Sequence, residues 1–293
     1  MHFLILCILS STGIFIVFKS IDRFNIPSFP IIVINYLVAT LLGFLINPGQ
    51  AEWSSIRQTE WLPASMIIGV LFIVMFFLVA YSSGKAGISV TTVASKMSVI
   101  FPILFSLIID PSDQITIIKA LAIVFTLCGV VLTVYRSQAG RLDWAVVYIP
   151  LILFVGMGFV DSLVKYAQHN LVNDRETALF SAVLFLNAFV TGILVLVFTP
   201  KYLRSFKRPA VWGWGILLGG VNFGSIFFLV RALNYISSSG RWIDSSVIFG
   251  VNNTGIVALS VLVGFWIFKE RLQPINWMGI ALSAIALILF AFG

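Results

Sequence analysis

The sequence predicts an all-α membrane protein in which ten transmembrane helices form two inverted five-helix repeats around a central cavity. Three observations predict this fold class: the composition, the spacing of the apolar runs, and a repeat between the two halves of the chain. Of the 293 residues, 60% are hydrophobic and only 10% are charged, whereas soluble proteins carry about 25% charged residues. Because so little polar surface is available, we expect the lipid bilayer to surround the chain.

Ten apolar runs are long enough, or nearly so, to cross the hydrocarbon core, which takes about 20 helical residues. The runs span 3–18, 29–46, 64–81, 88–109, 115–135, 144–166, 178–198, 211–233, 245–268 and 274–292. The polar breaks between them are too short to form a soluble domain. No basic segment or small-residue cleavage site accompanies the first run, so we expect a transmembrane helix there and not a removed signal peptide.

Lysine and arginine are unevenly distributed among the breaks, and this imbalance predicts the topology. The odd-numbered breaks carry eleven of these residues and the even-numbered breaks carry four. The positive-inside rule then places the odd-numbered loops in the cytoplasm and both termini on the other side. We expect a multi-pass protein of the plasma (inner) membrane, and we attribute the net charge of +7 to this orientation and not to a nucleic-acid partner.

The chain repeats itself weakly at an offset of 157 residues. An acid opens each aligned segment, and small residues recur seven positions apart within it. The aligned positions are Asp113 with Glu270, Ala122 with Gly279, and Gly129 with Ala286. Since each copy has five helices, an odd number, the repeats 1–139 and 140–293 must be inverted in the bilayer. Inverted repeats around a midplane site are the architecture of many secondary transporters.

This order of helices, with "FKERLQPINWMGIALSAIALIL" closing the chain, resembles the drug/metabolite transporter superfamily, EamA type. The family pattern is an acid such as Glu270, a polar residue, and small residues seven positions apart. The first half departs from this pattern at Asp113, where the family has Glu, and at Ala122, where it has Gly. A proline common in the fourth helix is present as Pro102. The resemblance implies a carrier with a central cavity and favours export of amino-acid-like metabolites by a monomer, without naming a substrate.

The segment "VASKMSVIFP" places Lys96 near the middle of the run 88–109. A lysine at that depth costs roughly 2.5–3.5 kcal/mol on insertion scales, and only lysines near helix ends can snorkel to the interface. Lys96 should therefore face a wet cavity or a counter-charge. Two interpretations remain open: a contact with an anionic group of a substrate, or a structural ion pair with Asp161.

The 157-residue offset aligns Ser95 and Lys96 with Asn252 and Asn253. Both halves thus place polar side chains at matching depth, where the lysine would attract an anion and the amides would donate and accept hydrogen bonds. The four residues are candidate substrate contacts. The alternative for the asparagines is hydrogen bonding between neighbouring helices.

Three further polar residues within the spans complete the candidate site. Asn35 and Asn187 occupy matching places in their helices and are predicted either to face the cavity or to join neighbouring helices. Asp161 is the one acid well inside a span. It is a candidate for proton coupling, and the alternative is that it only pairs with Lys96.

The motifs favour a transporter over other functions. We find no HExxH, no clustered intramembrane acids, no nucleophile–base pair and no phosphate-binding P-loop. We therefore expect a secondary transporter, not an enzyme, that moves amino acids or other carboxylate- or phosphate-bearing metabolites by alternating access, without a cofactor or a metal. The alternatives are a membrane-embedded enzyme, and a channel or accessory subunit without carrier activity.

Overall fold

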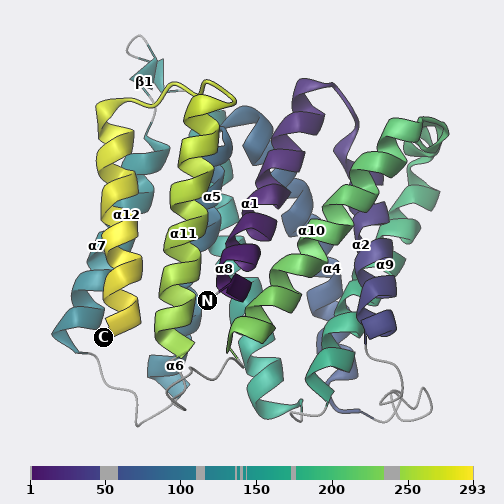
Figure 1. Cartoon of the computed structure of the whole chain (residues 1–293), viewed down its shortest axis with the longest axis horizontal. Coiled ribbons are helices and arrows are strands. Elements are labelled where there is room, and N and C mark those ends of the chain that lie inside the picture. Colours follow the sequence, from purple (N-terminus) through teal and green to yellow (C-terminus); the bar gives the residue numbers. More distant parts are fainter. Residues whose placement is uncertain are drawn as a thin grey trace.

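The computed structural model describes residues 2–46, 59–109, 116–135, 137–138, 141–142, 144–172, 176–233 and 245–292. Nearly all of them are helical (Figure 1). The helices are α1 (His2–Arg23), α2 (Ser28–Ile46), α4 (Leu62–Lys85), α5 (Ile88–Met97), α6 (Ile100–Ile109), α7 (Ile117–Val134), α8 (Trp144–Asn170), α9 (Thr177–Phe198), the 3-10 helix η2 (Pro200–Lys207), α10 (Pro209–Leu233), α11 (Ser245–Trp266) and α12 (Pro274–Phe292). Two short antiparallel strands, β1 (Ser137–Gln138) and β2 (Arg141–Leu142), form a hairpin before α8.

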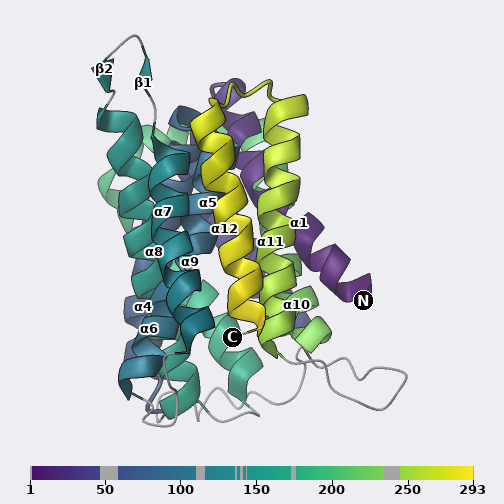
Figure 2. The ribbon, with the colours of Figure 1, turned by 90° about the vertical axis from the view of Figure 1, so that its left-hand side faces the viewer.

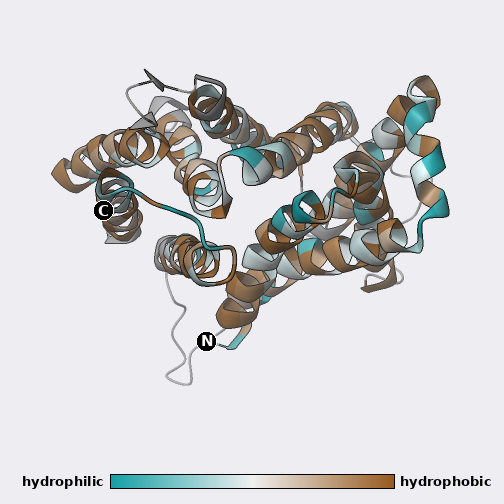
Figure 3. Ribbon diagram, turned by 90° about the horizontal axis from the view of Figure 1, so that it is seen from above, coloured by the Kyte–Doolittle hydropathy of each residue, from teal (hydrophilic) through white to brown (hydrophobic). Residues whose placement is uncertain are grey.

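Seven of these helices are long and apolar enough to cross a membrane: α1, α2, α4, α7, α8, α9 and α10. Shorter apolar helical stretches lie at Ile88–Leu104, Val251–Trp266 and Pro274–Phe290. The outer surface is strongly apolar, with Ile117 and Phe198 each 82% exposed, and the hydrophilic residues gather in the links between helices (Figure 3). Such a surface suits lipid and not water, so the prediction of an all-α, multi-pass membrane protein is confirmed.

One predicted span is two helices, and the expectation of ten helices is wrong at this point. The run 88–109 is interrupted after Met97, and α6 starts at Ile100. The physical reason is Pro102, which has no backbone N–H to donate to the carbonyl of Ser98, four residues earlier. Phe101 donates to that carbonyl instead, over 3.0 Å. The described residues consequently form eleven α-helices.

The helices pack in a closed circuit of contacts, and three of them, α7, α12 and α11, lie side by side in Figure 2. α1 packs against α10, α10 against α2, α2 against α9, α9 against α4, and α4 against α8. α8 contacts α5 and α6, α7 packs against α12, α12 against α11, and α11 against both α1 and α5. Neighbours along the circuit are therefore mostly far apart in sequence.

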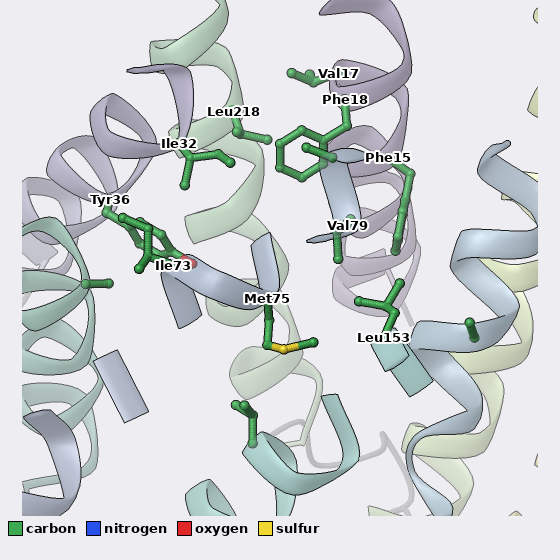
Figure 4. Close-up of a cluster of buried hydrophobic side chains, with 14 of the residues drawn as sticks. Phe15, Val17, Phe18, Ile32, Tyr36, Ile73, Met75, Val79, Leu153 and Leu218 are labelled. Carbon is green, nitrogen blue, oxygen red and sulfur yellow. The ribbon is translucent and has the colours of Figure 1, made fainter. Parts of the chain in front are cut away.

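The main apolar core runs through most of the helices, and Figure 4 shows the part of it between α1, α2, α4, α8 and α10. Phe18, Ile32 and Leu218 are almost completely buried there. Tyr36 is also fully buried, and its hydroxyl donates to the carbonyl of Phe72 in α4 over 3.0 Å. That bond satisfies a phenol group that would otherwise be costly inside a membrane protein.

The small residues of the repeat pack α7 against α12. A Cβ atom added to Gly279 would lie 2.4 Å from the backbone nitrogen of Thr133, and one added to Gly129 would lie 2.4 Å from Oγ of Ser283. Ala122 and Ala286 are fully buried. These positions let two backbones approach closely, as small residues do between membrane helices, so their role is structural.

The described parts of the links α1–α2, α4–α5, α7–α8, α9–α10 and α11–α12 all lie along the upper edge in Figure 1. These are the links in which the sequence concentrates its lysines and arginines. We refer to this edge as the basic face.

Candidate functional site

Lys96 lies in the last turn of α5 and is half-buried. Within the described residues its ammonium group makes no hydrogen bond and no direct ion pair. It lies within electrostatic range of Asp161 in α8 and of Cys7 in α1. The predicted partnership of Lys96 and Asp161 is therefore one of proximity without a direct bond, and the ammonium protons stay available to a ligand.

The break between α5 and α6 is held against α8 by polar contacts. Ser98 lies at the break, and its Oγ is 2.5 Å from the carbonyl oxygen of Ser95 and 3.2 Å from Oδ2 of Asp161. One turn further along α8, Nζ of Lys165 donates to the carbonyl of Pro102 over 3.3 Å. Interrupted membrane helices leave backbone groups free to meet ions and substrates, and here the break lies beside an acid and a lysine.

Ser95 and Asn252 present buried polar atoms that lack a partner among the described residues. These atoms are Oγ of Ser95 and Oδ1 of Asn252, whereas Asn253 is half-buried. Helix α1 approaches both helices near these residues, because Cys7 lies near Lys96 of α5 and the next residue, Ile8, lies beside Gly255 of α11. Buried polar atoms are normally hydrogen-bonded, so these unsatisfied groups are suited to a polar ligand or to water.

Asn35 and Asn187, which the sequence treats as equivalents, have different surroundings. Nδ2 of Asn187 donates to Oγ of Ser65 over 2.9 Å and so joins α9 to α4. Asn35 is fully buried in α2, and neither polar atom of its amide has a partner among the described residues. Asn187 thus has a packing bond, and a substrate contact remains a prediction for both residues.

Ser98 and Cys7 are neighbours of the site that sequence reasoning did not place there. The thiol of Cys7 donates to the carbonyl of Ser225 in α10 over 3.1 Å, so it joins α1 to α10. Ser98 could have been found from Pro102, since a proline frees the carbonyl four residues earlier. Among the described residues, His, Cys, Asp and Glu form no group of three that could hold a metal ion.

Glu270 makes polar contacts with the start of α5 that the sequence does not reveal. Its Oε1 accepts from the backbone N–H of Ile88 over 2.5 Å, and its Oε2 accepts from the N–H and the hydroxyl of Ser89 over 3.2 and 2.8 Å. The carboxylate thereby caps α5 at the basic face, where a negative charge favours a helix N-terminus. Gly87 has φ of 94° and no Cβ to meet the carboxylate. Asp113, which aligns with Glu270, lies outside the described residues.

Comparisons with known proteins support the fold and name no function. No family model matches the chain. A relative in Haemophilus influenzae (strain ATCC 51907 / DSM 11121 / KW20 / Rd), described as an uncharacterized protein, is 26% identical over 293 residues, which cover 98% of this chain and 96% of the relative. A solved structure described as "Crystal structure of protein" has a similar fold, with a TM-score of 0.57 and 14% sequence identity. The match covers 98% of this chain and 94% of the chain in that structure. At that identity the match shows a shared fold alone.

Proposed function

We propose that the chain is a secondary transporter of small metabolites that carry a carboxylate or a phosphate group, such as amino acids. It crosses the inner membrane ten times, as two inverted five-helix repeats of the EamA-type drug/metabolite transporter architecture, with α5 and α6 sharing one crossing. The basic face is cytoplasmic, both termini are on the other side, and the monomer exports its substrate by alternating access without a cofactor.

The observation that carries this proposal is the order of helix packing. In this proposal each helix of the first half has a counterpart in the second half: α1 has α8, α2 has α9, α4 has α10, α5–α6 has α11, and α7 has α12. Each helix in a contact can therefore be replaced by its counterpart. The contact between α1 and α10 then becomes that between α8 and α4, and the contact between α10 and α2 becomes that between α4 and α9. The pairs α2–α9, α7–α12 and α5–α11 map onto themselves. A carrier built from two inverted repeats has this symmetry of neighbours.

The symmetry has exceptions, and they support one conformation of a carrier. α1 contacts α4 and α5, and α5 contacts α12. Within the described residues, the counterpart pairs α8–α10, α8–α11 and α11–α7 have no contact of similar extent. Lys19 and Glu270 make polar bonds across the basic face, to the end of α4 and to the start of α5. We infer a state in which these bonds close the basic face.

The substrate class follows from the unpaired ammonium group of Lys96. A half-buried cation that has no direct counter-ion attracts an anionic ligand, and the unsatisfied oxygens of Ser95 and Asn252 can bind its polar groups. Asp161 supplies the coupling step in this proposal. Its Oδ2 accepts a hydrogen bond from Oγ of Ser98 over 3.2 Å, which holds the carboxyl group beside the break between α5 and α6.

Counterflow in proteoliposomes tests the proposal. Vesicles containing the purified chain are preloaded with unlabelled amino acids, organic acids or phosphate monoesters, and uptake of the same labelled compound is measured. We expect exchange of at least one anionic or zwitterionic compound, loss of exchange in Lys96→Ala, and partial exchange in Lys96→Arg, which keeps the charge. Lys207→Ala, which removes an exposed lysine from η2, is the matched control. If Lys96→Ala exchanges as fast as wild type, Lys96 is not a substrate contact.

A further inference from the structure

A second candidate site lies at the basic face. A cavity of about 510 Å³ opens there between the ends of α1 and α4 and the link between α11 and α12. Its lining includes Lys19, Lys85 and Arg271, with Glu270 as its acid. Phe268 and Leu272 also line it and pack partly against the main core. The cavity is therefore cationic on one part of its wall and apolar on another.

The cationic groups of this cavity are available to a ligand. Lys85 and Arg271 are exposed, and neither makes a hydrogen bond or an ion pair within the described residues. Lys19 donates to the carbonyls of Ser83 and Gly84 over 3.0 and 3.2 Å. Since an ammonium group has three donors, one remains available.

The acid of the cavity is already occupied. Three hydrogen bonds from the start of α5 reach Glu270, and the positive end of that helix compensates part of its charge. Asn276 is occupied as well, because its Nδ2 donates to the carbonyls of Leu132, Thr133 and Tyr135. Three cations thus face the cavity and its acid is engaged elsewhere, so the cavity has an excess of positive charge.

We propose that this cavity binds a phosphate group, carried either by an anionic lipid headgroup or by a soluble phosphate compound. The guanidinium of Arg271 can hold two phosphate oxygens at once, and the lysines act as point charges. The apolar part of the wall, Phe268 and Leu272, accommodates the carbon atoms attached to the phosphate. Basic pockets between membrane helices are known to bind lipid headgroups in this way.

Occupancy of the cavity would affect the contact that closes the basic face. Lys19 and Lys85 belong to α1 and α4, whereas Arg271 follows α11. A phosphate bound to all three would join the ends of α1 and α4 to the link whose Glu270 caps α5. We therefore expect the ligand to favour the closed basic face, and the proposal holds whether or not the chain proves to be a transporter.

The test compares two double variants of the full-length protein. Lys85→Gln with Arg271→Gln removes two cations from the cavity and spares Lys19, which holds the end of α4. Lys207→Gln with Arg208→Gln removes the same charge from the same face, outside the cavity lining. Thermal unfolding is followed in neutral detergent with inorganic phosphate against chloride at equal ionic strength. A second arm uses nanodiscs of phosphatidylcholine with and without phosphatidylglycerol.

Each outcome has a definite meaning. Stabilisation of wild type and control by phosphate, with binding about tenfold weaker in the cavity variant, supports a soluble ligand. If phosphatidylglycerol produces this pattern of stabilisation and inorganic phosphate does not, the result supports a lipid headgroup as the ligand. A cavity variant that responds like wild type in both arms overturns the proposal. The proposal is also overturned if binding weakens as much in the control variant as in the cavity variant, because the basic face then attracts the anion in a general way.

Discussion

The helix pair α5–α6 and helix α11 align at the 157-residue offset, yet they differ in continuity and in charge. α5–α6 is broken after Met97, whereas α11 continues from Ser245 to Trp266. Pro102 aligns with Leu259, and Lys96 aligns with Asn253. One proline and one lysine thus give the first element a break beside a charge, while the second keeps a continuous helix with neutral amides. The difference indicates that the first half carries the more specialised chemistry of the candidate site.

The largest effect is expected when the lysine is replaced by its counterpart. Lys96→Asn gives α5 the side chain that α11 has at the same place, and we expect counterflow to fall about 100-fold, equivalent to roughly 2.7 kcal/mol. Thermal stability should not fall, because the change removes a charge that costs roughly 3 kcal/mol within a membrane. Asn253→Ala is the matched control, with an expected loss below about tenfold. Equal losses in both variants would mean that the two halves contribute alike.

The cap on α5 should be the next most sensitive feature. Glu270→Gln keeps the shape of the side chain and removes its charge, so it weakens three charge-assisted hydrogen bonds, and we expect a loss of about 2 kcal/mol in stability. Hydrogen exchange at the amides of Ile88 and Ser89 should quicken, while exchange across α11 stays unchanged. Glu60→Gln, at an exposed position, serves as control. Unchanged exchange at both amides would refute the cap.

Asp161 should affect coupling more than binding. Asp161→Asn can still bond to Ser98 but cannot carry a proton between the two faces. We expect transport driven by a proton gradient to fall about tenfold, or roughly 1.4 kcal/mol, with counterflow exchange nearly retained. Flux measured with and without an imposed pH gradient separates the two activities. If counterflow falls as far as gradient-driven flux, Asp161 serves Lys96 or the substrate and not the proton.

Restoring continuity to α5–α6 is the mildest change. Pro102→Ala supplies an N–H for the carbonyl of Ser98 and makes the element resemble α11, so we expect stability to rise by about 1 kcal/mol. Transport should slow if the break serves the site. Pro150→Ala is the control, since α8 stays helical through Pro150. Thermal unfolding and counterflow of both variants measure the effect, and a destabilised Pro102→Ala would show that the break is preferred for packing.

Most of the membrane helices can be predicted from hydrophobicity alone, because a bilayer requires long apolar helices. The predicted run 64–81, for example, lies within α4, Leu62–Lys85. The break at Ser98 does not follow from Pro102 alone, because a helix can also accommodate a proline, as α8 does at Pro150. Whether a helix breaks depends on what neighbouring helices offer to the freed backbone groups.

The candidate site was predictable where a charge stands out from its apolar surroundings, as Lys96 and Asp161 do. The bonds of Glu270 were not predictable, since its partner Ile88 is 182 residues away in sequence. Asn35 and Asn187 show the same limit. Their matching positions predict one role, but Asn187 donates to Oγ of Ser65, whereas the amide of Asn35 has no partner among the described residues. Sequence identifies unusual residues, and the approach of distant helices decides what they contact.

The interleaved packing has a consequence for how the protein is made. α1 packs on α10 and α11, α2 on α9 and α10, and α7 on α12, so every one of these helices finds its main neighbours in the later half of the chain. During synthesis the earlier helices therefore enter the bilayer before their partners exist. Biogenesis must keep them apart from other proteins until the ribosome has delivered α12, and a truncated product ending near residue 139 should be a substrate for membrane proteases.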